Sequence, residues 1–469
     1  MKTLHVGSRR LPLASLILVA MAGPTAISSV ALAATTALDA SGAWPTAPNA
    51  TVRFYTNCDD DGLGSLRQAI AASASGDSVR ASPTLSCSTI TLQSTLMFGQ
   101  EDLDIRGNGI GRPTITASAG VTDGLIRHLG TGQLNLQFIS LSGGHKYKND
   151  GQARGGCVYG SGNVAINVAR VSNCIAKGIG FEQGLGGGVF SQGQTSLRLS
   201  EVSGNLAVST GGQYASGGGM YAVGSVDIDR SVVAGNATSG SNSWGGGFTT
   251  PGGATVVNSA IINNSATTSG GAHIHPPGST PISITNTTVS GNSAVRVGGL
   301  TCVGKTTVLS STITNNTSIE GSSGGRIIGG GLDLGAGNHV IASTILTGNY
   351  SGGEGFATSI NLSSSTGATL AGDHNHISGS TLALPNDTIT TASQLLPLAL
   401  NGSSRPTHAL SASSLDTDTG VAPVGQTYDQ RGYPFLRSVG PGTDIGAYEY
   451  DPDYIYRDGF DAAFGGPPT

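Results

Sequence analysis

The chain has 469 residues, with 23 basic residues against 28 acidic residues and a formal net charge of −5. This weakly negative balance gives no electrostatic basis for binding nucleic acid or an anionic membrane surface. Glycine accounts for 74 residues, about twice its usual share, whereas charged residues make up only 11% of the chain, which favours a β architecture with many tight turns over disorder.

The first 33 residues have the pattern of an export signal. Basic residues precede a short apolar run over 11–21, and Ala31-Leu32-Ala33 places small residues at the two positions that a signal peptidase reads. We therefore expect cleavage after Ala33, with an uncleaved anchor helix as the alternative. The mature chain is then expected to hold no transmembrane segment and to begin with a linker over 34–52.

The segment over 53–84 is expected to form an N-terminal cap with a short helix. Ser65 suits the N-cap position, Gln68 is its capping-box partner, and the helix should run from Leu66 to about Ser73. A cap is physically required, because the first coil of a solenoid otherwise exposes a strand edge. A calcium loop at Asp59–Asp61 is the alternative, although these residues lack the alternating ligand spacing of an EF-hand.

The five cysteines are consistent with disulfides in an exported chain. Cys58 and Cys87 flank one N-terminal segment, whereas Cys157 and Cys174 lie within one repeat, and we expect these two pairs. Cys302 is then left over and should point into the core. The alternative is that all five are buried thiols, and their spacing does not match a zinc site.

From residue 155 two markers recur with one period. The first is a cluster of glycines followed by an apolar residue, and the second is a Gly-Asn or Asn-Asn turn, as in Val202-Ser203-Gly204-Asn205. Two markers in step indicate a repeat architecture, with six intervals spanning 175 residues, about 29 each. The last glycine of each cluster lies at Gly156, Gly188, Gly219, Gly247, Gly271, Gly299 and Gly331.

Each repeat unit alternates apolar and polar residues and lacks an amphipathic helix, so we expect three short strands per unit. Such a unit cannot bury its apolar face alone, and successive units must stack with parallel pairing and right-handed winding. The turn asparagine tolerates the left-handed backbone region, and its amide can bond the asparagine of the next coil. The sequence therefore predicts an all-β, right-handed parallel β-helix over 85–365, a pectin-lyase-like solenoid; a globular sandwich is the alternative.

Two parts of the chain resemble known families. The markers over 155–349 resemble the repeats of polymorphic outer-membrane proteins and related β-helix surface proteins. Residues 366–449 resemble the choice-of-anchor Q region, which implies closure of a β-helix ahead of a sorting tail and implies no chemistry. The motifs that carry this second resemblance are Gly372-Asp373-His374-Asn375, Leu396–Gly402, Pro406–Leu410, Asp429–Gly432 and Asp444–Glu449.

The tail over 450–469 contains a possible sorting signal. Its ending, Tyr454–Asp461, is similar to an aromatic-x-x-Gly-Phe-acidic ending on exported proteins of some Gram-negative bacteria. These resemblances imply a secreted or cell-surface protein, outer-membrane associated, of a Gram-negative bacterium.

An outward column just after the glycines is the candidate binding face. Stacked outward residues on a flat sheet can bind an extended glycan, and Phe190 over Tyr221 would provide an apolar platform. His273 and Asp333 complete the proposed glycan-binding set. The predicted column consists of Val158, Phe190, Tyr221, Thr249, His273, Thr301 and Asp333.

An enzyme is the alternative function, as a polysaccharide lyase or glycoside hydrolase acting along the β-helix face. Asp227 and Asp229 lie two apart on one predicted strand, a spacing that permits an acid–base pair. Arg198, one coil earlier, is placed to pair with Asp227, which favours a structural ion pair instead. The charged segment over 143–154 is expected to project as a loop and is a second place for such a site.

His273 and His275 alternate along a strand as a possible metal pair, but no third ligand is evident, so we expect no metal and no cofactor. The sequence thus favours a secreted or cell-surface β-helix protein of structural or adhesion type, without catalytic residues. Its expected partners are extracellular glycans or the surface of a host or neighbouring cell.

Overall fold

The computed structural model describes residues 50–109, 112–278, 280–320, 322–323, 326–352 and 359–453. All of them belong to the compact unit Thr46–Thr469. The expected export signal, most of the expected linker and the motif at Tyr454–Asp461 lie outside the described residues. Among the described residues, no helix is long and apolar enough to cross a membrane.

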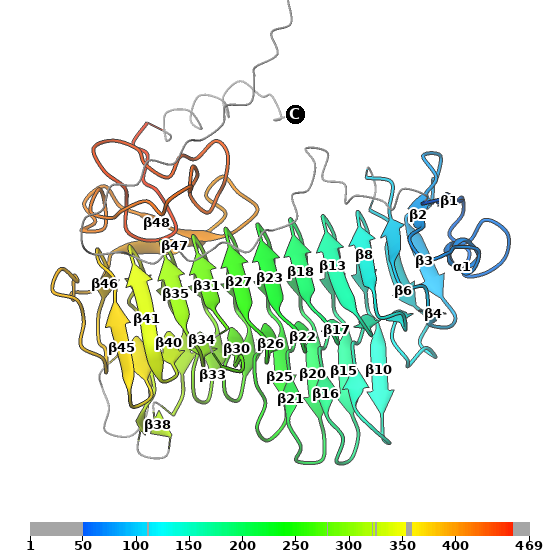
Figure 1. Ribbon diagram of the computed structural model, residues 1–469, viewed down its shortest axis with the longest axis horizontal. Coiled ribbons are helices and arrows are strands. Elements are labelled where there is room, and N and C mark those ends of the chain that lie inside the picture. The colour runs from blue at the N-terminus through cyan, green and yellow to red at the C-terminus, as the bar shows by residue number, and fades with distance from the viewer. Residues whose placement is uncertain are drawn as a thin grey trace, which may run out of the picture. The chain divides into compact units, whose positions relative to one another are not determined.

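The described chain winds through five parallel sheets, A to E, whose strands stack coil upon coil (Figure 1). This confirms the right-handed parallel β-helix. Sheet A consists of β1 (Val52–Tyr55), β2 (Ser78–Ala81), β5 (Leu103–Arg106), β8 (Gln133–Gln137), β13 (Asn163–Asn167), β18 (Thr195–Arg198), β23 (Val226–Asp229), β27 (Ala254–Val257), β31 (Ile282–Thr285), β35 (Thr306–Leu309), β41 (Gly337–Ala342) and β45 (Ala368–Ala371).

Sheets B and C carry the next strands of each coil. Sheet B consists of β3 (Thr89–Leu92), β6 (Thr114–Ala117), β9 (Ser140–Ser142), β14 (Arg170–Ser172), β19 (Glu201–Ser203), β24 (Val232–Ala234), β28 (Ala260–Ile262), β32 (Thr288–Ser290), β36 (Thr312–Thr314), β42 (Ile345–Leu346) and β46 (His376–Ile377). Sheet C consists of β4 (Leu96–Phe98), β7 (Ile126–His128), β12 (Val158–Gly160), β17 (Val189–Ser191), β22 (Met220–Ala222), β26 (Phe248–Thr250), β30 (Ala272–Ile274), β34 (Leu300–Cys302), β40 (Leu332–Leu334) and β44 (Leu362–Ser364).

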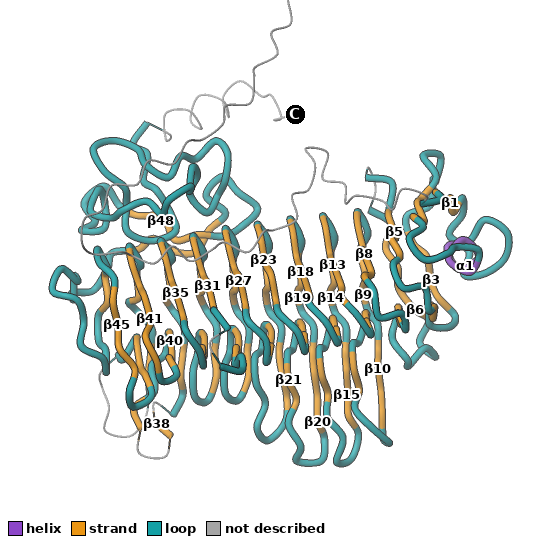
Figure 2. Tube along the Cα trace, in the orientation of Figure 1, coloured by secondary structure: helices purple, strands orange, loops and turns teal. Residues whose placement is uncertain are grey.

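Sheets D and E form an extension of the coils between sheets B and C (Figure 2). Sheet D consists of β10 (His145–Lys148), β15 (Ile175–Gly178), β20 (Leu206–Ser209), β25 (Ala237–Ser239), β29 (Ser265–Ala266), β33 (Ser293–Ala294), β37 (Thr317–Ser318) and β43 (Tyr350–Ser351). Sheet E consists of β11 (Ala153–Arg154), β16 (Gly184–Leu185) and β21 (Ala215–Ser216). Two antiparallel pairs complete the fold: β38 (Ser322–Ser323) with β39 (Arg326–Ile327), and β47 (Leu395–Ala399) with β48 (Thr407–Leu410).

This extension corrects two expectations. The sequence predicts three strands per unit, but the described coils with sheet D have four, and those with sheet E have five. The charged segment over 143–154 is not a free loop, because it forms β10 and β11, the first strands of sheets D and E. The short strands of these sheets add only two to four residues each, which is too few to show alternation.

The core is built of inward columns that continue from coil to coil. In sheet B, one column pairs Val171 with Val202, then Val202 with Val233, and it continues through Ile261, Val289 and Ile313 to Leu346. Every member is at most 1% exposed. Full burial of such a side chain contributes about 1.5–3 kcal/mol, so the stacked columns supply the driving force for coil stacking.

The asparagine turn forms a continuous ladder, as predicted. The backbone N–H and the Nδ2 of Asn236 both donate to Oδ1 of Asn264, at 2.9 and 3.0 Å. The left-handed conformation, however, belongs to the preceding residue, such as Gly235 or Asn263, and not to the ladder asparagine itself. Members of this ladder are Asn205, Asn236, Asn264, Asn292, Asn316, Asn349 and Asn361.

The glycine marker has a steric cause. A Cβ built on Gly246 would lie 2.4 Å from the carbonyl oxygens of Gly270 and of Ser265, because a strand of sheet D crosses beneath the glycine cluster. The backbone of the neighbouring strand cannot move aside cheaply. Each repeat unit therefore has a glycine at this corner because the neighbouring backbone leaves no room for a side chain.

We expect Gly246→Ala to destabilise the protein by about 1–3 kcal/mol, since the added methyl group must displace backbone atoms. Chemical denaturation followed by circular dichroism measures this change. Gly120→Ala is the matched control, because a Cβ there meets nothing within 4 Å. Equal stabilities of the two variants would contradict the steric explanation.

The N-terminal cap contains the expected short helix, α1 (Leu66–Ala71), two residues shorter than predicted. Ser65 Oγ accepts from the Gln68 backbone N–H at 3.1 Å, whereas Gln68 Oε1 accepts from Gly64. Asp60 pairs with Arg67 at 2.6 Å, so this carboxylate has a structural partner. The two expected disulfides, Cys58–Cys87 and Cys157–Cys174, are both present, and Cys302 is a free, buried thiol.

The C-terminal region over 395–450 packs along the outer face of sheet B (Figure 1). His408 Nε2 lies 2.8 Å from Ser290 Oγ, and the Ala447 N–H donates to Thr312 Oγ1 at 3.0 Å. The coils themselves continue to β46, past the boundary expected at residue 365. Leu382 and Leu384, which follow β46, pack against the apolar core of the solenoid. The choice-of-anchor-like segment therefore covers a side of the solenoid as well as following its end.

Candidate functional site

The register of sheet C defines the outward column that the sequence predicts as a binding face. Tyr159 pairs with Phe190 and Phe190 with Tyr221. The prediction that Val158 belongs to this column is wrong by one residue, because Val158 pairs with Val189 and is fully buried. The error arises because Cys157 replaces the third glycine of the marker, so alignment on the glycines alone shifts the unit. The remaining predicted members, Thr249, His273, Thr301 and Asp333, occupy successive coils of the column.

Three rings of this column form a parallel stack. The Tyr159 and Phe190 ring centroids are 5.5 Å apart and those of Phe190 and Tyr221 are 5.7 Å apart, each pair with an interplanar angle of 3°. Phe190 is only 1% exposed, since its faces are covered by its neighbours. The expected platform therefore exists as a stack in which the Phe190 ring is enclosed and only the two tyrosines are partly exposed.

A second stack, which the sequence does not reveal, lies beside the first. Trp244 stacks between Tyr214 and His273, at 4.9 and 5.6 Å. His273 occupies the same column as Tyr221, two coils further along, which places the two stacks next to each other. We call the combined feature the aromatic row: Tyr159, Phe190, Tyr221, Tyr214, Trp244 and His273.

The aromatic row carries polar groups that remain free to bind a ligand. Within the described part of the chain, no residue hydrogen-bonds the indole N–H of Trp244 or the hydroxyl groups of Tyr214 and Tyr221. Tyrosine and tryptophan thus offer apolar edges and hydrogen-bonding tips together, a combination that suits a sugar with its CH and OH groups.

Two arginines flank the first stack. The Arg127 guanidinium carbon lies 4.3 Å from the Tyr159 ring centroid, and that of Arg154 lies 5.0 Å from the Phe190 centroid. Both are cation–π contacts. Arg127 precedes Tyr159 in the sheet C register, so extending the repeat one coil toward the N-terminus would have found it.

His273 and Asp333 have different surroundings. Burial, and then the neighbouring His275, lowers the pKa of His273 to about 4, so its ring is neutral at pH 7 and suited to stacking on Trp244. Asp333 forms an ion pair with Arg326 and accepts from Ser363 Oγ at 2.6 Å. Asp333 is thus engaged in structural contacts, two coils beyond His273.

His273 and His275 meet edge to face at 6.1 Å. Among the described residues, no group of three or more His, Cys, Asp or Glu side chains is arranged to hold a metal ion.

The alternative catalytic pair lies on sheet A, not on sheet C. Arg198 pairs in register with Asp229, at 3.8 Å, and not with Asp227 as expected. Arg230 also donates to Asp229, at 2.8 Å. Asp227 accepts from Gln194, and burial raises its pKa above the ordinary value. The Asp229 carboxylate is therefore neutralised by two arginines, and Asp227 and Asp229 do not form an isolated acid–base pair.

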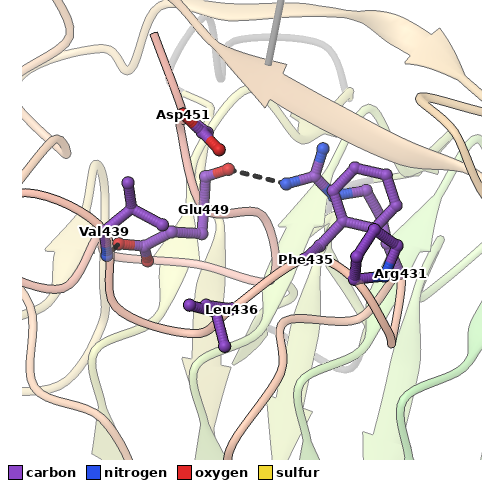
Figure 3. A pocket seen from close by; sticks show the side chains of 7 residues that line it. Arg431, Phe435, Leu436, Val439, Glu449 and Asp451 are labelled. Carbon is purple, nitrogen blue, oxygen red and sulfur yellow. Dashed lines mark hydrogen bonds between the residues drawn. The ribbon is translucent and has the colours of Figure 1, made fainter. Parts of the chain in front are cut away.

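A small cavity lies in the C-terminal region (Figure 3). Its volume of about 20 Å³ suffices for a single water molecule and not for a sugar. Arg431 beside it lies between the rings of Phe435 and Tyr448, at 3.8 and 3.9 Å, and donates to the Glu449 carbonyl oxygen at 2.7 Å. These contacts hold the region together and give it no ligand site.

Comparison with known proteins gives little further information. No family model matches the chain, and no curated protein matches it, so the two family resemblances remain predictions. A solved structure titled "Crystal structure of pectate lyase Pel9A" is similar at 13% identity, over 86% of this chain and 98% of that chain, with a TM-score of 0.38. A likeness of this size carries no argument about function.

Proposed function

We propose that the chain is an exported, non-catalytic β-helix protein that binds an extended glycan along the aromatic row. The observation that carries this proposal is the row itself, with two adjoining ring stacks on successive coils. It extends from β12 to β30, four coil steps, or about 19 Å at the usual strand spacing. That length allows contact with several consecutive sugar units.

Export is supported by the two disulfides, since such bonds persist in oxidising compartments and are rare in the cytosol. We propose secretion or display at the surface of a Gram-negative cell, with attachment to a neighbouring or host surface through the bound glycan.

A non-catalytic role is supported by the state of the carboxylates near the row and on sheet A. Asp333 is paired with Arg326, and Asp229 is paired with Arg230. Glycoside hydrolysis commonly needs two carboxyl groups with different environments facing one bond. Asp227 is the remaining candidate, and it lies on a different sheet from the aromatic row.

Trp244→Ala is expected to weaken binding of the preferred glycan about 30-fold, as removal of an aromatic anchor commonly costs about 2 kcal/mol. Affinity electrophoresis of the full chain against a panel of neutral and uronate polysaccharides measures this change. Phe181→Ala is the matched control, because Phe181 is an exposed aromatic residue in the turn between β15 and β16, outside the row.

Two outcomes would contradict the proposal. Equal loss of affinity in the Trp244 and Phe181 variants would exclude the aromatic row as the binding face. Release of reducing ends or unsaturated products by the unmodified chain, abolished by Asp227→Ala/Asp229→Ala, would instead support the enzyme.

A further inference from the structure

We propose that Arg127 and Arg154 form a subsite for a carboxylate group, so that the glycan bound along the aromatic row is a polyuronate. This inference rests on the proposed function and names its ligand class. It starts from the placement of two guanidinium groups at one end of the row, over the rings of Tyr159 and Phe190.

The backbone places both arginines at the corner where sheet E meets sheet C. Arg127 is the central residue of β7, one coil before Tyr159, and Arg154 ends β11, directly before the glycines that lead into β12. Each side chain reaches forward by one coil to lie over a ring of the next. The rings that the two groups contact are stacked with centroids 5.5 Å apart, so the groups lie on neighbouring coils. Burial lowers the pKa of Arg127, and the charge of Arg154 lowers it further.

Positive charge is in excess at this corner. Asp123 is shared between Lys146, with which it forms an ion pair, and Arg127, whose Nε is 3.7 Å away. Arg154 donates from Nε to the neutral Gln152 Oε1 at 2.8 Å. Within the described residues, no carboxylate lies within ion-pair distance of Arg154. Arg127 and Lys146 thus share one carboxylate, and Arg154 has none, in a chain whose net charge is −5.

One guanidinium nitrogen at this corner also lacks a partner. Nη1 of Arg127 is buried and has no hydrogen-bond acceptor among the described residues. An unsatisfied buried donor costs about 1–3 kcal/mol, and more when it is charged. A ligand carboxylate beside the two arginines would offset their mutual repulsion and compensate the charge that this unsatisfied donor carries.

The ring contacts favour an anion over a neutral sugar. A guanidinium group lying over an aromatic ring is held in place. Nε and Nη2 of Arg154 both donate to Gln152 Oε1, which leaves Nη1 of Arg154 to donate to a ligand carboxylate. The aromatic row beyond Arg154 would contact the neutral parts of the same chain. A sulfate ester presents similar anionic oxygens, so the experiment separates the two groups.

The test measures dissociation constants of the full chain for polygalacturonate, for the same polymer after methyl esterification, and for dextran sulfate. We expect polygalacturonate to bind at least tenfold more tightly than the ester, and added salt to weaken it, because a charge-assisted contact is lost or screened. Arg154→Met, which keeps an apolar stem over Phe190, should remove most of this preference. Arg154→Lys should restore part of it.

Arg170→Met is the matched control, because it removes an exposed arginine from sheet B and should leave the preference unchanged. Circular dichroism and thermal melting check that each variant is folded, and Arg127→Met gives a second measurement at the same corner. Equal affinity for polygalacturonate and its ester, or a preference that survives in both Met variants, would overturn the subsite. Tighter binding of dextran sulfate would overturn the carboxylate assignment.

The same experiment separates this inference from the proposed function. If binding depends on Trp244 but not on either arginine, the aromatic row binds a glycan and the polyuronate assignment is wrong. If no polysaccharide binds at all, both are wrong.

Discussion

Arg437→Met is expected to destabilise the C-terminal region by about 3–5 kcal/mol, because it breaks a buried ion pair by removing one partner. Arg437 is 1% exposed and lies 3.3 Å from the Glu449 carboxylate. It also donates to the carbonyl oxygens of Gly446 and Asp444, at 2.9 and 2.6 Å. The substitution leaves all three acceptors buried without this donor.

The loss should be local, because the region over 395–450 contacts the solenoid from one side. We expect faster hydrogen exchange in β47 and β48 than in the coils, and an early transition in denaturant that the unmodified chain lacks. Arg437→Met/Glu449→Gln should recover part of the stability, since it removes the unpaired charge. Arg170→Met changes an exposed ion pair and should cost less than about 1 kcal/mol.

A uniform loss of protection throughout the coils would contradict this local picture. It would mean that the C-terminal region and the solenoid unfold as one cooperative unit. An unchanged exchange rate in β47 and β48 would instead show that the buried pair makes no net contribution there, which is known to occur when desolvation offsets attraction.

The fold could be predicted because two of its corners demand particular residues. One corner has no room for a side chain and takes glycine, as at Gly246. The other takes asparagine, as at Asn264, because a buried side-chain amide bonds the neighbouring coils. Residues of these kinds recur in the sequence and reveal the period. The corner between sheets A and B has a less specific signal, because its left-handed positions are held by residues as different as Leu199 and Arg230. A serine follows each of these two residues, as at Ser231, whose hydroxyl accepts from the backbone of the preceding coil.

The candidate site was predicted in part for a related reason. Phe190 and Tyr221 each lie two residues after the last glycine of their cluster, so counting from the marker finds them. Trp244 and Arg154 stand directly before the glycines, at equivalent positions of the register, but counting back from the marker gives only this position and not the side chains that it approaches. Their proximity to the column depends on the turn that carries sheet E back onto sheet C, which is a tertiary property.

Asn264→Ala is expected to destabilise the solenoid by about 3–5 kcal/mol, although it removes only a small neutral group. Oδ1 of Asn264 accepts from both the backbone N–H and Nδ2 of Asn236, and Nδ2 of Asn264 donates to the Val233 carbonyl oxygen at 3.0 Å. All of these groups are buried, and water cannot replace the lost partner. Two or three unsatisfied groups at about 1–3 kcal/mol each give the expected loss.

The ladder makes this effect different from an ordinary core substitution. Asn236 and Asn292 lie in the neighbouring coils, so a break at Asn264 interrupts a chain of hydrogen bonds that polarise one another. Asn242→Ala, at an exposed turn, is the control and should change the stability by less than about 0.5 kcal/mol. Guanidinium denaturation of both variants measures the difference. A loss at Asn264 no larger than at Asn242 would mean that stacking of the apolar columns alone holds the coils together, and that the asparagines only shape the turn.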